Sequence, residues 1–107
     1  MVIIETTVFT RRIKELMPDD DYRALQSALI RAPDTGDIIR NSGGIRKVRW
    51  SAAGRGKRGG VRVIYFWQVS EDQLLMLYVY AKNELDDLTP DQLKVLRKRV
   101  VEEFGDE

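Results

Sequence analysis

The spacing of apolar residues changes from a helical period to a strand period and back along the chain. Near the N-terminus, apolar side chains recur every three or four residues, which predicts amphipathic helices over residues 8–17 and 20–31. Past Gly36 the period becomes two, and β-branched and aromatic residues become frequent. This pattern predicts three strands, over residues 45–50, 61–69 and 73–81.

Capping residues and prolines mark the ends of these elements. A short apolar opening, residues 2–5, predicts a first strand, and Thr6 or Thr7 can cap the helix that follows. Pro18 and three aspartates separate the first helix from the second. Thr89, with a proline in the next position, begins a last helix that is expected to run to about Phe104.

The order strand, two helices, three strands, helix predicts an α+β fold in a single domain, residues 1–107. The links between the three long strands are too short for parallel crossovers, so we expect an antiparallel meander within a small, mostly antiparallel sheet. The two N-terminal helices and the C-terminal helix are expected to pack on one face of it. A chain of 107 residues suits one modest core.

Composition removes several kinds of chemistry. The chain has no cysteine and no histidine, which excludes disulfides, thiolate zinc sites and the usual near-neutral proton carrier. Acid–base chemistry must therefore use Lys, Arg, Tyr, Asp or Glu, and no metal or cofactor is expected. No stretch approaches the roughly 18 apolar residues of a membrane span, and the start lacks the features of a signal peptide. We therefore expect a cytoplasmic protein without membrane contact.

A net charge of +1 hides a cationic middle between acidic ends. Residues 38–70 contain no acidic residue, whereas the rest of the chain holds ten basic and 17 acidic residues. The basic residues of this middle segment are Arg40, Arg46, Lys47, Arg49, Arg55, Lys57, Arg58 and Arg62. Such asymmetry favours an anionic partner, with nucleic acid as the first candidate, although a solvated basic face is the alternative.

The segment GRGKRGGVR, residues 54–62, concentrates glycines and cations in a predicted loop. It lacks the GxxxxGK[ST] spacing of a nucleotide P-loop, and no helix follows it. Glycines permit close approach to a phosphate chain, and Arg55, Lys57 and Arg58 can neutralise its charge. The loop is therefore predicted to contact the phosphate backbone of a nucleic acid.

Further basic residues lie on the predicted strands. Lys47 and Arg49 are two residues apart and so share one face, with Arg46 on the other. Arg62 begins the next strand and Lys82 ends the last. In a meander the positions on the three strands can converge at one rim of the sheet. For Arg46, Lys47 and Arg49, an ordinary exposed strand face is the alternative.

The segments GGIRKVRW (43–50), GRGKRGGVRVIYFW (54–67) and LYVYAKNELDDLT (77–89) resemble the toxins of bacterial type II toxin–antitoxin modules. The resemblance is to the RelE superfamily, nearest its HigB-like branch, and extends over essentially the whole chain. It implies a RelE-like microbial ribonuclease-type fold and a metal-independent endoribonuclease that cuts translated mRNA in the ribosomal A site. It also implies a cognate antitoxin, expected to be a helix-turn-helix protein, through which alone the toxin would meet operator DNA.

The resemblance also implies a site. Lys47 and Arg49 match the family's basic pair on one strand, Arg62 matches the arginine after the loop, and Lys82 matches the lysine that ends the last strand. Attack by the RNA's own 2′-hydroxyl needs alignment and fixed positive charge around the phosphorane. We therefore expect Arg62 to stabilise the phosphorane, Arg49 to bind phosphate, and Lys47 or Lys82 to accept the proton.

The general acid is not assigned by the resemblance. Where the best-studied members have an arginine after the strand-ending lysine, this chain has Asn83, and their later tyrosine has no counterpart beyond Leu88. Tyr80 or Tyr78 could donate a proton or stack on a base, or could be a core aromatic. Arg46, Tyr80 and Asn83 are predicted to contact RNA. The alternatives to a nuclease are a ParE-like gyrase poison on the same fold and a non-catalytic RNA-binding module.

Overall fold

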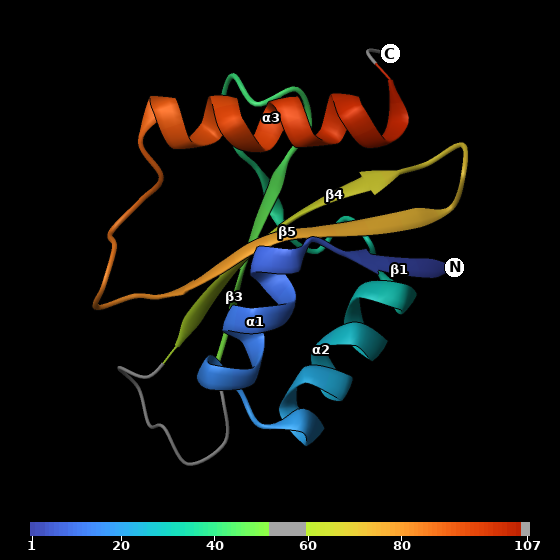
Figure 1. The fold of residues 1–107 in the computed structure, drawn as a ribbon. Coiled ribbons are helices and arrows are strands. Elements are labelled where there is room, and N and C mark those ends of the chain that lie inside the picture. Colours follow the sequence, from blue (N-terminus) through green and yellow to red (C-terminus); the bar gives the residue numbers. More distant parts are fainter. Residues whose placement is uncertain (52–59, 106–107) are drawn as a thin grey trace.

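The structure of the protein is a computed structural model that describes residues 1–51 and 60–105. Within these residues, a five-stranded mixed sheet crosses the molecule between two layers of helices (Figure 1). The strand order is β1-β5-β4-β3-β2. β1 runs parallel to β5, and the other neighbours are antiparallel, so the predicted α+β class and the β3-β4-β5 meander are confirmed. The strands are β1 (Val2–Glu5), β2 (Asp37–Ile38), β3 (Arg46–Trp50), β4 (Val61–Gln68) and β5 (Gln73–Ala81).

Local capping explains where the helices begin. Thr6 accepts a hydrogen bond from the backbone N–H of Phe9 at 3.1 Å and so caps α1. Thr89 caps α3, as the Thr-Pro signal predicted, and it also forms a reciprocal capping box with Gln92. No helix in the described part of the chain is long and apolar enough to cross a membrane. The helices are α1 (Thr7–Leu16), α2 (Asp19–Arg31) and α3 (Pro90–Phe104).

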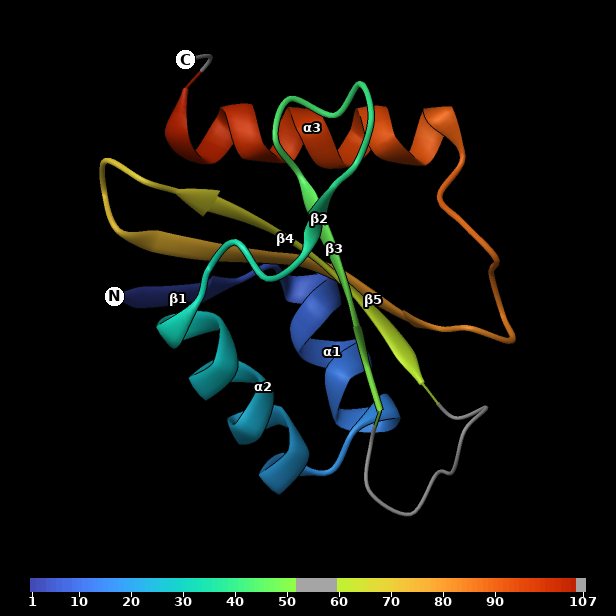
Figure 2. The same ribbon diagram turned by 180° about the vertical axis from the view of Figure 1, so that it is seen from behind.

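The helices cover both faces of the sheet, so the prediction that all three share one face is wrong. α1 and α2 pack on one face through Phe9, Ile13 and Leu25, whereas α3 packs on the other through Val100 (Figures 1 and 2). β4 and β5 carry nearly continuous apolar runs, and strands of this kind are buried on both faces. A single helical layer would have left half of these side chains in water.

A β-bulge in β5 decides which side chains face α3. Ile64 pairs with Tyr78 but Tyr65 pairs with Met76, so Leu77 is an extra residue on β5. Strict alternation counted from Met76 would place Tyr78 on the side of α1. Because of the bulge, Leu77, Tyr78 and the tyrosine two residues later pack with the α3 core instead.

Candidate functional site

Two arginines stand directly opposite each other where β3 and β4 meet the loop between them. Arg49 of β3 pairs in register with Arg62 of β4, which pairs in turn with Tyr80 of β5. Residues opposite each other in an antiparallel pair point to the same face. In the next row, Lys47 lies opposite Ile64, a member of the α3-side core. Lys47, Arg49 and Arg62 therefore share the face that α3 covers.

The end of β5 reaches the same rim. The backbone N–H of Lys82 donates to the carbonyl of Gly60 at 3.3 Å, which places Lys82 beside the start of β4. Its side chain is exposed. Arg49, Arg62 and Lys82 thus stand at one end of the sheet, with Lys47 one row further in. The predicted loop contacts Arg55, Lys57 and Arg58 lie outside the described residues.

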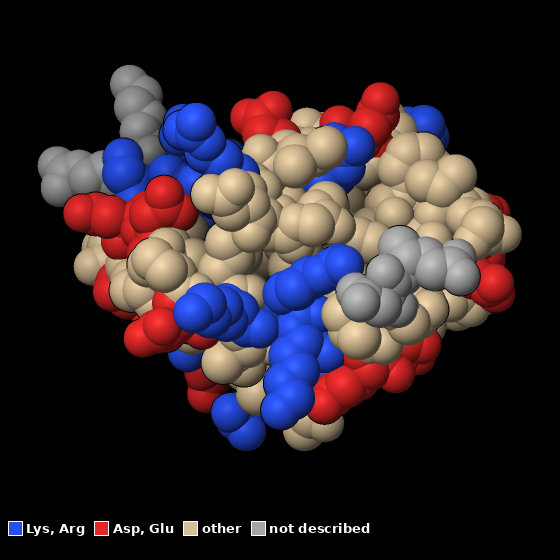
Figure 3. All heavy atoms as spheres, turned by 90° about the horizontal axis from the view of Figure 1, so that it is seen from above, with Lys and Arg blue, Asp and Glu red and all other residues tan. Residues whose placement is uncertain are grey.

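An open groove of about 1010 Å³ extends from Arg49 across the α3 face. Its floor and walls come from β2, β3, the turn after β2 and the first half of α3. Among the described residues, its positively charged lining residues are Arg40, Lys47, Arg49, Lys94 and Arg97, and its negatively charged ones are Asp37 and Asp87. Figure 3 views the molecule from the side of α3, where Lys and Arg side chains form several separate groups, some of them beside Asp and Glu side chains. The groove thus has an excess of positive charge next to the arginine pair.

Asp87 restrains Lys47. The Lys47 ammonium lies 3.4 Å from the Asp87 carboxylate, and the lysine side chain is only 24% exposed. The same carboxylate oxygen accepts the backbone N–H of Leu88 at 2.9 Å. Asp87 therefore forms a local turn and also pairs with a strand residue 40 positions away. The ion pair therefore fixes the position of the Lys47 ammonium within the groove.

Tyr80 does not present its ring to a ligand. The side chain is fully buried, and its hydroxyl has no hydrogen-bond partner among the described residues. Burial raises the pKa of Tyr80, and the Asp87 charge adds to the rise while Arg62 opposes it. The prediction that Tyr80 contacts RNA does not hold in this conformation, because a buried ring cannot stack on a base. It is a core aromatic with a weakly acidic hydroxyl.

The other two residues predicted to contact RNA, Arg46 and Asn83, differ in their accessibility. Arg46 lies on the opposite face of β3, where its guanidinium donates to the carbonyl of Gly36 at 2.7 Å and to that of Asp34 at 3.3 Å. It holds the turn before β2 and does not reach the groove, because alternation along the strand turns it away. Asn83 is exposed just beyond β5, close in sequence to Lys82.

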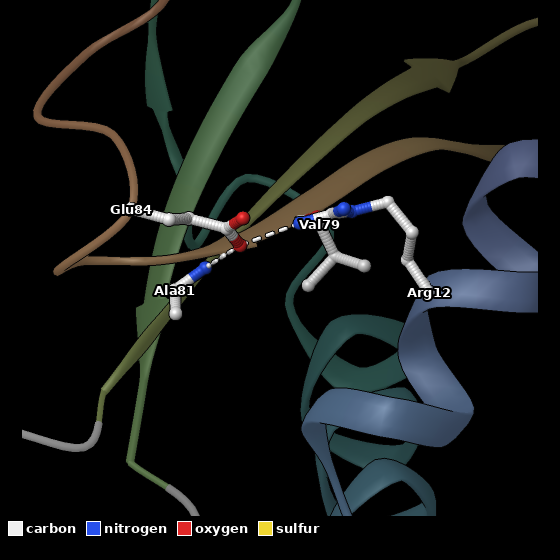
Figure 4. A network of polar contacts seen from close by, with 4 residues as sticks. All are labelled: Arg12, Val79, Ala81 and Glu84. Carbon is white, nitrogen blue, oxygen red and sulfur yellow. Dashed lines mark hydrogen bonds and ion pairs between the residues drawn. The ribbon is translucent and has the colours of Figure 1, made fainter.

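Arg12 and Glu84 fix the segment after β5, and sequence reasoning did not find this pair. Glu84 accepts hydrogen bonds from the backbone N–H of Ala81 at 2.8 Å and from Arg12 at 2.5 Å (Figure 4). Arg12 also donates to the carbonyl of Val79 at 2.7 Å and lies over the ring of Tyr78. The Ala81 hydrogen bond, followed by the Arg12 contact, lowers the pKa of Glu84. Together they tie α1 to the segment that carries Lys82.

Chemically, the site offers cations rather than metal ligands. Among the described residues, no group of three or more His, Cys, Asp or Glu side chains is placed to hold a metal ion. Arg40, Lys94 and Arg97 line the groove although they were not singled out as site residues. The uninterrupted cationic run from residue 38 gave a signal for Arg40, but nothing local marks the two residues of α3.

Comparison with known proteins agrees with this arrangement. The sequence model of the family described as the RelE toxin of the RelE / RelB toxin-antitoxin system matches residues 1–104. Among solved structures, the fold is similar to that of the Escherichia coli toxin RelE, a double arginine-to-alanine mutant in the free state. The TM-score is 0.60 at 8% sequence identity, and the match covers 94% of this chain and 96% of that one. At 8% identity, the match to this solved structure is evidence of a shared fold alone.

Proposed function

Because this chain belongs to the RelE family of toxins from toxin–antitoxin systems, we propose that it is a ribosome-dependent endoribonuclease that cleaves translated mRNA in the A site and so inhibits translation. Its partners in this proposal are the ribosome, mRNA and a cognate helix-turn-helix antitoxin in the cytoplasm. Membership of the HigB-like branch stays a prediction.

The observation that carries the proposal is the registered pair of Arg49 and Arg62 at the mouth of a basic groove. Two arginines directly opposite each other on neighbouring strands are a costly arrangement unless an anion binds between them, because like charges directly opposite destabilise a sheet. Arginine binds phosphate through two parallel hydrogen bonds and stays protonated. A phosphate held by this pair would meet fixed positive charge as its own negative charge increases.

The proposed reaction uses the substrate's own nucleophile. The 2′-oxygen bonds to the adjacent phosphorus while its proton passes to a base, and the 5′-oxygen leaves with a proton from an acid. The products are a 2′,3′-cyclic phosphate and a 5′-hydroxyl end. Arg62 stabilises the phosphorane and Arg49 binds a phosphate oxygen. Lys82 is the better candidate for the base, because Lys47 is already paired with Asp87 whereas Lys82 lies at the same end of the sheet as Arg49 and Arg62.

Sequencing the 5′ ends of cellular transcripts after induction of the toxin tests this function. Cuts within translated codons that depend on ongoing translation support the proposal. Double-strand DNA breaks without such cuts would identify a gyrase poison instead. Growth arrest with neither signal would leave a non-catalytic RNA-binding module.

The Arg62→Ala variant tests the site. Removing one fixed donor from a charge-stabilising site costs on the order of 10²–10³ in rate, so growth arrest should disappear. Arg23→Ala is the matched control, because that arginine side chain on α2 is 76% exposed and remote from the groove. Both proteins should keep the unfolding midpoint of wild type within a small margin. Full toxicity in a folded Arg62→Ala protein would contradict the assignment.

A further inference from the structure

The turn after β2 forms one wall of the groove and has a defined shape. Ser42 is 1% exposed, donates through its hydroxyl to the carbonyl of Ile39 at 2.6 Å, and accepts the N–H of Ile45 at 2.9 Å. Ile39 and Ile45 also join through a backbone hydrogen bond of 2.8 Å. Asn41 and Gly43 take left-handed conformations, with φ of 60° and 73°. The backbone of this wall, which carries Arg40 and Asn41, is therefore fixed in shape by its own hydrogen bonds before any ligand arrives.

α3 docks directly on this turn and forms the facing wall. The guanidinium of Arg97 donates to the carbonyl of Gly43 at 3.3 Å. A Cβ atom on Gly43 would lie 2.7 Å from the guanidinium carbon, so only glycine permits this approach. Lys94 lies three residues before Arg97 and faces the same groove. Residues at this spacing have Cβ atoms roughly 5–6 Å apart, which is comparable with the distance between successive phosphates of an extended strand.

We propose that this groove binds the stretch of single-stranded RNA next to the scissile phosphate, with Arg40, Lys94 and Arg97 contacting its phosphates. The inference rests on the proposed function and names a substrate path for the same site. The groove is continuous with Arg49, so a strand whose phosphate lies at the arginine pair has its neighbouring nucleotides over the groove. α3 is thus a part of the RNA-binding surface as well as a cover for the core.

The lining of the groove favours RNA over an acidic protein segment. Between the cations lie Ile38, which is 58% exposed, Leu93 and the amide of Asn41. Single-stranded RNA needs both kinds of contact, since its phosphates bind cations and its bases stack on apolar surface or bond to amides. The carboxylates of an acidic protein segment would bind the cations but would make no use of the apolar and amide groups between them.

The test is direct binding of a short fluorescent oligoribonucleotide with 2′-O-methyl sugars, which in-line attack cannot cleave. The variants are Lys94→Gln, Arg40→Gln and the double variant. Lys98→Gln is the matched control, because Lys98 is exposed on the same helix but does not line the groove. Glutamine and lysine have similar helix propensities, so these changes should leave α3 intact. Affinity is measured by anisotropy across a range of salt concentrations.

Each groove variant should weaken binding roughly 3- to 10-fold and reduce the slope of log K against log salt by about 0.7 for each phosphate that the variant no longer neutralises. Lys98→Gln should behave as wild type. Equal binding by groove and control variants, or no binding by wild type, would overturn the inference. So would groove variants that no longer bind poly-glutamate but still bind the oligoribonucleotide as wild type does, because the groove would then belong to an acidic protein.

The outcome is independent of catalysis. If the groove variants bind RNA more weakly than wild type but the wild type cuts no transcripts, the RNA-binding groove is supported and the nuclease function is refuted. If the wild type cleaves transcripts but the Lys94→Gln, Arg40→Gln and double variants bind the oligoribonucleotide as wild type does, the RNA path is refuted and the nuclease function stands.

Discussion

Removing Arg12 should destabilise the protein far more than removing its neighbour on α1. Arg12 interacts with Glu84, with the carbonyl of Val79 and with the ring of Tyr78, whose centroid lies 5.1 Å from the guanidinium carbon. Glu84 interacts with Arg12 and with the backbone of Ala81. Arg12→Ala therefore removes the ion pair, the hydrogen bond to Val79 and the packing on the ring. Glu84→Ala removes the ion pair and the acceptor for the Ala81 N–H.

The expected sizes follow from these interactions. The ion pair joins side chains that are 23% and 42% exposed, so it should contribute about 0.5–1 kcal/mol. The hydrogen bond from Arg12 to Val79 adds about 1–1.5 kcal/mol, and the contact with the ring adds about 0.5–1 kcal/mol. Arg12→Ala should then lower the free energy of unfolding by roughly 2–3.5 kcal/mol and Glu84→Ala by roughly 1–2 kcal/mol.

Urea unfolding of wild type, both single variants and the double variant provides a double-mutant cycle. The coupling energy should equal the ion-pair contribution, about 0.5–1 kcal/mol. Arg11→Ala is the control, since Arg11 is exposed and should change stability by less than about 0.5 kcal/mol. A cost for Arg12→Ala no larger than that of the control, or a coupling energy near zero, would refute the reasoning.

Three more changes test other parts of the fold. Gly36→Ala places a Cβ 2.9 Å from the ring of Tyr65 and should destabilise the protein by about 1–3 kcal/mol in thermal or urea unfolding; an unchanged midpoint would show that the ring moves freely. The lowered pKa of Glu84 means that its stabilising contribution is complete above its ordinary value of 4.5 and is lost as the pH falls through the folded-state pKa. Glu84→Gln should therefore flatten the decline of stability below that pH, and a decline as steep as that of wild type would contradict this. Thr89→Ala removes the capping box with Gln92 and should cost about 1 kcal/mol in the same unfolding assay, whereas an unchanged free energy of unfolding would mean that water caps the helix equally well.

The helix and strand boundaries could be predicted because the signals that set them are local. Thr6 and Thr89 cap the helices that begin after them, as the sequence indicated. The meeting of Arg49 and Arg62 also followed from the sequence, since short connections force neighbouring strands to pair antiparallel and bring the strand ends together.

Features that depend on distant parts of the chain could not be predicted in this way. Asp87 is an ordinary turn residue until the fold brings Lys47 to it, and nothing near Lys94 indicates that α3 docks against the turn at Gly43. The side of the sheet that α3 covers is likewise set by the path of residues 82–89. A signal for helices on both faces did exist in the unbroken apolar runs of β4 and β5, which alternation on a half-buried strand would not produce.

The extra residue at Leu77 lets β5 shorten without rearranging either core. Deleting it would restore simple alternation and leave Tyr78, Val79 and Tyr80 on the faces that they occupy now, opposite their present partners on β4. The loss would be confined to the Leu77 side chain itself, which is 1% exposed in the α3-side core. Natural homologues are therefore expected to differ by one residue between Met76 and Val79 while keeping the same two cores.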